Sequence, residues 1–215
     1  MSTERGSIWG RCWLWIECVL IYGVLPLVFA HPWMRYAKVP ALYGLLVLAM
    51  WLARCTWGTW RPLLEVGTLR SCVSSFVWRG LLAAVVIAAA TWWLGPEYFL
   101  RFPRSRPVMW ALVMLLYPGL SAYPQELIYR TCFFARYAVI FPTPLAMVVA
   151  SSVAFGWLHV VFGNVPAVVL SFLAGIMLSH TYLRTRSTLA VSVEHALYGC
   201  LVFTIGLGRY FYLPL

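Results

Sequence analysis

Three short motifs in the second half of the chain place ionisable side chains within apolar segments. They are Gln125-Glu126-Leu127-Ile128-Tyr129-Arg130, Phe155-Gly156-Trp157-Leu158-His159 and the pair Glu194-His195. Ionisable groups are costly in apolar surroundings and usually face a cavity or one another. A carboxylate and two imidazoles are groups that can take a proton from water, with or without a metal ion. The motifs therefore predict one buried point at which water could be activated.

Glu126 and Arg130 are four residues apart, so on a helix they share a face and can pair. One interpretation is a salt bridge that neutralises both charges near an interface. The other is a carboxylate that Arg130 holds ionised, ready to take a proton from water. The spacing alone leaves both interpretations open.

The two histidines differ in how easily packing explains them. His159 could simply bond a neighbouring backbone group, with Phe155 packed on the same face and Gly156 permitting close helix approach. Glu194 and His195 are adjacent in the last apolar segment, where two ionisable groups favour a functional role. Adjacent helix positions point about 100° apart, so only one of this pair can aim at a common site.

Other ionisable residues are expected outside such a site. Glu17 has no obvious partner in the sequence and is expected near an interface. His180 lies near the end of its apolar segment, close to Arg184 and Arg186, and is also expected at an interface. His31 is expected in a loop.

The composition indicates the elements that must position these side chains. Of the 215 residues 63% are hydrophobic and 10% are charged, and the mean hydropathy is +0.83. A soluble domain is nearer half apolar and a quarter charged, and disordered chains are poor in apolar residues. The chain is therefore expected to be a polytopic membrane protein. Its net charge of +10 comes mostly from arginines between apolar segments, where cations meet anionic headgroups, so nucleic-acid binding is not expected.

We expect an all-α fold, a transmembrane bundle of about seven or eight helices. Several of the apolar segments are shorter than the ~20 residues that an upright span needs, so tilt or re-entrance is expected. The N-terminal transmembrane helices would occupy residues 1–123, and residues 124–215 would carry the motifs within the same membrane domain. The segments are Cys12–Ala30, Pro40–Ala53, Val73–Leu94, Pro107–Tyr117, Pro124–Ile140, Pro144–Phe162, Pro166–Leu183 and Ser187–Leu207.

The order of the motifs resembles that of a known family. E-x-x-x-R, then F-x-x-x-H, then a histidine on the last helix is similar to the CAAX-prenyl-protease and bacteriocin-processing (CPBP) family of intramembrane proteases. The resemblance covers about residues 124–207. It implies a helical membrane fold with a conical cavity that admits a peptide end. It also implies that a Glu and the first His activate water, while the second His and an Asn one turn later stabilise the oxyanion.

The chain departs from the family pattern at two positions. The family's first motif is E-E-x-x-x-R, and Gln125 stands where its first Glu is usually the base. The last motif is His-x-x-x-Asn or Asp, and Gly199 stands at its end. Three explanations remain open: Glu126 turns into the base position, Glu194 supplies the carboxylate, or the protein is an inactive member that binds peptides.

The resulting expectation is an intramembrane endopeptidase that cleaves a peptide bond near the membrane face. Its catalytic residues would be Glu126, His159 and His195. Arg130, Gln125 and Glu194 would support them, with Gln125 as a hydrogen-bond donor to a substrate carbonyl or the oxyanion. The alternative is a catalytically inactive CPBP-like membrane protein that acts in peptide or bacteriocin immunity or as a scaffold.

The expected cofactor and surroundings follow from the same residues. His159 and His195 could hold a zinc ion, although the chain has no H-E-x-x-H helix. The expected partners are a peptide or membrane-protein substrate and the lipid bilayer, with no nucleic acid. The expected location is a bacterial inner membrane, as a multi-pass protein. A transporter is disfavoured because no repeated halves are visible.

Overall fold

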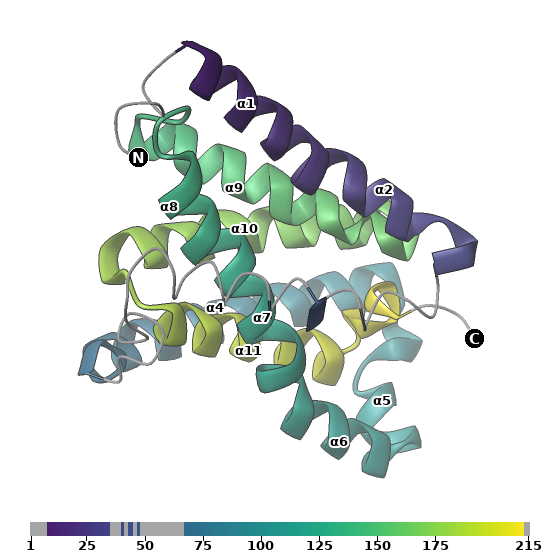
Figure 1. Cartoon of the computed structure of the whole chain (residues 1–215). Coiled ribbons are helices and arrows are strands. Elements are labelled where there is room, and N and C mark those ends of the chain that lie inside the picture. The colour runs from purple at the N-terminus through teal and green to yellow at the C-terminus, as the bar shows by residue number, and fades with distance from the viewer. Residues whose placement is uncertain (1–7, 35–39, 41–42, 45–46, 48–66, 213–215) are drawn as a thin grey trace.

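The structure, a computed structural model, describes residues 8–34, 40, 43–44, 47 and 67–212. Helices and short helical turns make up nearly all of this part, and it contains no strand (Figure 1). The predicted all-α bundle is confirmed. The helix predicted at Pro40–Ala53 lies largely outside the described residues.

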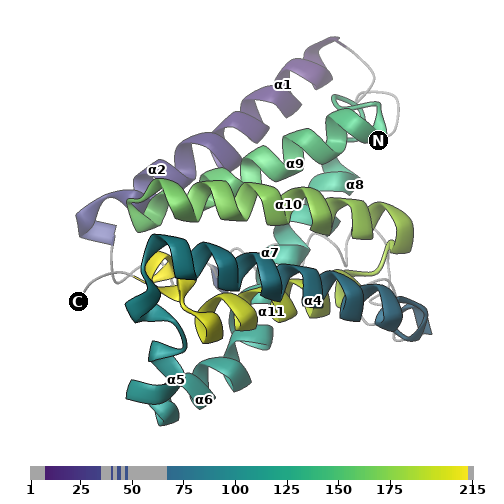
Figure 2. The same cartoon turned by 180° about the vertical axis from the view of Figure 1, so that it is seen from behind.

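Two layers of helices enclose the candidate site, and both views show the same arrangement (Figures 1 and 2). One layer holds α9 (Pro144–Leu158), α10 (Val165–Thr185) and the N-terminal helix. That N-terminal helix comprises α1 (Ile8–Cys18), the π-helical segment η1 (Val19–Val24) and α2 (Leu25–Ala30). The other layer holds α4 (Gly67–Leu94) and α11 (Thr188–Ile205).

One long helical stretch crosses both layers. It comprises α6 (Pro107–Tyr117), η5 (Pro118–Ala122), α7 (Tyr123–Glu126), η6 (Leu127–Cys132) and α8 (Phe133–Tyr137). The prediction of two separate helices, Pro107–Tyr117 and Pro124–Ile140, is wrong on this point. Proline usually ends a helix because it lacks an N–H donor. Here the stretch passes Pro118 in a π-helical segment and keeps helical backbone angles at each junction.

Short elements close the ends of the bundle. They are η2 (Pro32–Met34), η4 (Pro96–Tyr98), α5 (Arg101–Ser105), η7 (His159–Phe162) and η8 (Leu207–Phe211). The Asn164 side chain caps α10 by accepting from the N–H of Ala167 at 2.9 Å. Its amide nitrogen donates to the carbonyls of Phe162 and Tyr210, which ties η7 to η8.

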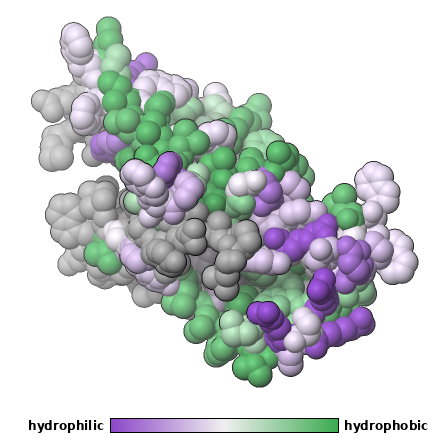
Figure 3. All heavy atoms as spheres, turned by 90° about the vertical axis from the view of Figure 1, so that its right-hand side faces the viewer, coloured by the Kyte–Doolittle hydropathy of each residue, from purple (hydrophilic) through white to green (hydrophobic). Residues whose placement is uncertain are grey.

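The outer surface is suited to lipid. In the part of the chain that the structure describes, five helices are long and apolar enough to cross a membrane: Ile8–Ala30, Thr68–Leu94, Pro144–Phe162, Val165–Thr185 and Thr188–Ile205. Large apolar side chains such as Trp78, Val85 and Trp93 of α4 are exposed. Figure 3 shows a face with broad hydrophobic areas and hydrophilic residues gathered to one side. The protein is an integral membrane protein.

Small residues let α9 and α10 pack closely. A Cβ at Gly156 would lie 3.1 Å from Cα of Phe172, and one at Gly175 would lie 3.0 Å from Cα of Ser152. Lipid tails are as apolar as the helix surfaces, so the hydrophobic effect does not drive helices together in a membrane. Close backbone approach and polar contacts must stabilise their association instead. The predicted role of Gly156 in helix approach is confirmed.

Glu17 has partners that its sequence context does not reveal. Arg136 of α8 donates to both oxygens of the Glu17 carboxylate, at 2.9 and 2.5 Å, and Tyr137 donates to it at 3.0 Å. The expectation of a carboxylate without a partner is therefore wrong. Arg136 and Tyr137 lie more than a hundred residues from Glu17 along the chain, and their contacts with it connect α1 to α8.

Candidate active site

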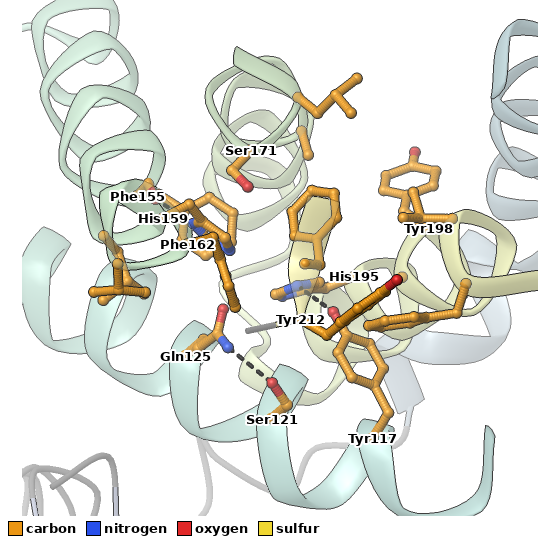
Figure 4. Close-up of a pocket in the computed structure, with 18 of the residues that line it drawn as sticks. Tyr117, Ser121, Gln125, Phe155, His159, Phe162, Ser171, His195, Tyr198 and Tyr212 are labelled. Carbon is orange, nitrogen blue, oxygen red and sulfur yellow. Dashed lines mark hydrogen bonds between the residues drawn. The ribbon is translucent and has the colours of Figure 1, made fainter. Parts of the chain in front are cut away.

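A cavity of about 410 Å³ lies where α7, α9, α10 and α11 approach one another. Aromatic and aliphatic side chains supply most of its wall, and among the residues that the structure describes no Asp, Glu, Lys or Arg lines it. Figure 4 shows the polar groups that face it. They are Tyr117, Ser121, Gln125, His159, Ser171, His195, Tyr198 and Tyr212. Few polar groups in an apolar cavity are typical of a binding site.

His159 presents one unprotonated nitrogen to this cavity. It follows the last residue of α9, and its Nδ1 lies 2.8 Å from the carbonyl oxygen of Phe155. Because a carbonyl can only accept, Nδ1 must carry the hydrogen and Nε2 of the neutral ring keeps its lone pair. The ring is 7% exposed and packs against Phe155, whose centroid lies 4.9 Å away. The predicted packing of Phe155 on His159 is confirmed.

His195 has a partner at each ring nitrogen. Nδ1 lies 2.8 Å from Oε1 of Glu126, and Nε2 lies 3.0 Å from the hydroxyl of Tyr117. An ionised carboxylate can only accept, so Nδ1–H donates to Glu126. The contacts form a chain that runs from the buried carboxylate through the imidazole to a phenol at the cavity wall.

Glu126 lies behind His195 and does not line the cavity. Its side chain is 0% exposed, and its Oε2 lies 3.3 Å from Nε of Arg130. The predicted pairing of Glu126 with Arg130 on one helix face is confirmed. The equally buried Arg130 guanidinium lies 4.5 Å from the ring centroid of Phe155, a cation–π contact. Within the described residues its terminal nitrogens have no hydrogen-bond partner, so Glu126 and Phe155 must together stabilise the charge.

Gln125 faces the cavity from the residue before Glu126. Its amide nitrogen donates to Oγ of Ser121 at 2.9 Å, as Figure 4 shows. Its amide oxygen is buried and has no hydrogen-bond partner in the part of the chain described. Gln125 therefore has an unpaired acceptor next to the cavity, and its amide nitrogen carries a second N–H besides the one donated to Ser121. The donor role expected from the sequence stays a prediction.

Glu194 points away from the cavity, towards α4. Its carboxylate is 0% exposed, pairs with Arg79 at 2.8 Å and accepts from Tyr198 at 2.6 Å. Arg79 also donates to Oγ1 of Thr181 at 2.8 Å. These contacts join α4, α10 and α11, and Glu194 reaches the cavity only through Tyr198.

Tyr117 is a cavity residue that the sequence motifs did not single out. Its phenol occupies the place that a Cβ at residue 199 would need, far inside van der Waals contact. Gly199, one turn after His195, thus leaves room for a hydroxyl from α6. The departure of Gly199 from the family pattern was the signal in the sequence, but it could not identify the side chain that fills the space.

The side chains that the structure places at the cavity do not form the ligand set of a catalytic zinc ion. Such sites use three protein ligands and keep a position for water. Both nitrogens of His195 already have partners, and the described residues contain no group of three His, Cys, Asp or Glu side chains that could hold a metal ion.

One comparison with known proteins bears on this arrangement. Residues 105–201 match the family described as Type II CAAX prenyl endopeptidase Rce1-like. The match confirms the resemblance to the CPBP family. It begins at residue 105, ahead of the resemblance seen from residue 124, and so includes Tyr117 as well as His159 and His195. No curated protein and no solved structure matches the chain.

Proposed function

Because residues 105–201 match a family of CAAX-type endopeptidases, we propose that this membrane protein hydrolyses a peptide bond in the cavity beside His159 and His195. The observation that carries the proposal is the hydrogen bond from Nδ1 of His159 to the carbonyl of Phe155. It leaves Nε2 with a lone pair in a cavity that His195 also lines. The family match does not favour the alternative of an inactive scaffold or immunity protein.

His159 is the proposed general base. Nε2 accepts a hydrogen bond from the attacking water, and the buried amide oxygen of Gln125 accepts another, which orients the water. Glu126 is unsuited to this role because its carboxylate is buried against His195 and Arg130. A base within hydrogen-bond reach of its proton typically accelerates a reaction ~10² to 10⁴-fold.

The proposed reaction has two steps. In the first, the water oxygen bonds to the carbonyl carbon, one water proton moves to Nε2 of His159, and the C=O π electrons move to the carbonyl oxygen. In the second, that oxygen re-forms the carbonyl, the C–N bond breaks, and His159 returns its proton to the leaving nitrogen. The products are a carboxylic acid and an amine. In this proposal the negative oxygen develops on the side of His195, which Glu126 holds in place.

The cavity wall limits which substrates fit. Burying a charged side chain without a partner is costly, and none of the described lining residues is Asp, Glu, Lys or Arg. We therefore propose a peptide or membrane-protein segment with uncharged, apolar residues next to the cleaved bond. Aromatic lining residues such as Phe162, Phe203 and Phe211 would pack against it.

The test uses purified full-length protein in detergent. Internally quenched peptides with uncharged apolar residues at the bond are compared with a set carrying Lys or Glu beside it. We expect wild type to cleave the first set, and the variants His159→Ala, His195→Ala and Glu126→Ala to lose this cleavage. His180→Ala is the matched control, because this histidine is exposed on α10 and does not line the cavity. Cleavage that survives all three site changes would sink the proposal.

A further inference from the structure

The hydroxyl of Tyr117 ends the chain of contacts that starts at Glu126. We propose that Tyr117 donates the hydrogen bond that stabilises the negatively charged carbonyl oxygen during hydrolysis. This inference rests on the proposed function and assigns a catalytic role to a residue outside the three motifs. It places the oxyanion beside α6 as well as α11.

The phenol of Tyr117 faces the same cavity as the two histidines. Tyr117 lines the cavity together with His159 and His195, so all three side chains face one volume (Figure 4). Its ring is held between two aromatic neighbours, Phe203 with a centroid distance of 5.6 Å and His195 at 6.0 Å. A donor held in place before reaction needs no reorganisation when charge develops.

The space next to residue 199 is filled by the Tyr117 phenol. Helix positions 195 and 199 are one turn apart on the same face, so a side chain at 199 would project next to His195. Any Cβ there would collide with the Tyr117 phenol. Glycine at 199 and tyrosine at 117 therefore fit each other, and the hydroxyl of Tyr117 occupies the space next to His195 that a side chain at 199 would fill.

The hydrogen bonds around His195 make the Tyr117 hydroxyl a donor. With His195 neutral and Nδ1–H donated to Glu126, Nε2 accepts from the Tyr117 hydroxyl. As negative charge develops on the substrate, the hydroxyl turns about its C–O bond and donates to the carbonyl oxygen instead of Nε2. Glu126 keeps His195 in place during this change. Tyr117 keeps its proton throughout.

The decisive variant is Tyr117→Phe, which removes the hydroxyl and keeps the ring. Loss of one oxyanion donor typically costs ~10² to 10³ in kcat, and KM should change little because the bond forms mainly in the transition state. A phosphinate peptide, whose tetrahedral oxygen mimics the oxyanion, should lose affinity in parallel. Tyr137→Phe is the matched control: it removes a buried phenol hydroxyl bonded to Glu17, outside the cavity lining.

A second pair of variants tests the same contact from α11. Gly199→Ala should push the phenol aside and lower kcat to a similar extent. Adding Tyr117→Ala to Gly199→Asn clears the ring and places an amide donor one turn after His195, so this double variant should recover part of the lost kcat. Partial recovery supports an oxyanion donor, because a merely structural role for Tyr117 would not be rescued by an amide.

The outcomes separate this inference from the proposed function. If wild type cleaves the apolar peptides and Tyr117→Phe has an unchanged kcat and phosphinate affinity, the role of Tyr117 is overturned and the proposed function stands. If Tyr117→Phe lowers both kcat and phosphinate affinity while Tyr137→Phe keeps wild-type values, the role of Tyr117 as an oxyanion donor is supported. If wild type cleaves none of the peptides, the proposed function fails and the role of Tyr117 fails with it.

Discussion

Nδ1 of His195 donates to Oε1 of Glu126 at 2.8 Å, on the ring edge opposite the Tyr117 hydroxyl. The carboxylate nearest to the histidines is therefore occupied with orienting one of them. Glu126 is better suited to positioning His195 than to taking a proton from water. The lone pair of His159 then becomes the basic group available in the cavity.

The Glu126–Arg130 pair should contribute both to the free energy of unfolding and, through the position of His195, to kcat. Glu126→Ala leaves a fully buried guanidinium without its carboxylate, which typically costs ~3–5 kcal/mol. Replacing the whole pair in Glu126→Leu/Arg130→Met should recover most of this loss, because apolar residues of similar volume often substitute for a buried pair without a penalty. Activity should stay low, since His195 still lacks its acceptor. Thermal unfolding in detergent and kcat, measured together, check this; recovery of both would contradict a positioning role for Glu126.

Glu194 should matter for stability and not for the chemical step. Its carboxylate pairs with Arg79 of α4 and accepts from Tyr198, away from the cavity. Glu194→Gln keeps the acceptor but removes the charge, which should cost ~1–3 kcal/mol of unfolding free energy. We expect kcat to remain near wild type. A loss of kcat as large as that of His159→Ala would instead make Glu194 the missing catalytic carboxylate.

Removal of metal ions should leave cleavage intact. Three protein ligands are usual for a catalytic zinc, and the described residues bring no such group together. We expect unchanged kcat after treatment with 1,10-phenanthroline and its removal by dialysis. A loss of activity that Zn²⁺ restores would contradict the metal-free route.

Gln125 should orient water without accepting its proton. Gln125→Ala removes the buried amide oxygen and should lower kcat about tenfold or more, with His159 still able to act as base. Gln125→Glu keeps an acceptor at the same place and should retain activity. Comparison of kcat for the two variants tests this, and equal losses in both would argue against an orienting acceptor.

The local contacts within helices could be predicted from the sequence. Glu126 and Arg130 pair because residues four apart share a helix face, and Phe155 packs on His159 for the same reason. The apolar segments also located the membrane helices to within a few residues. The prediction ended one helix at Tyr117 and began the next at Pro124, but π-helical segments carry one continuous helical stretch through this region.

The contacts between distant parts of the chain could not be predicted. Tyr117 meets His195 across 78 residues, and Arg79 meets Glu194 across the interface of α4 and α11. Such pairs depend on how helices pack, and no spacing rule within one segment encodes that. The hydrogen-bond partners also decide which ring nitrogen of each histidine is available, and hence which histidine can act as base.

The central claim is that Nε2 of His159 takes the proton from water, and chemical rescue tests it most directly. His159→Ala leaves a space at the cavity wall that added imidazole can enter. We predict that kcat falls by ~10² to 10⁴ in this variant, and that imidazole restores part of it in a concentration-dependent way. The exposed-histidine variant His180→Ala should show neither effect. A His159→Ala protein that cleaves as fast as wild type would contradict the account, and so would a loss that imidazole leaves unchanged.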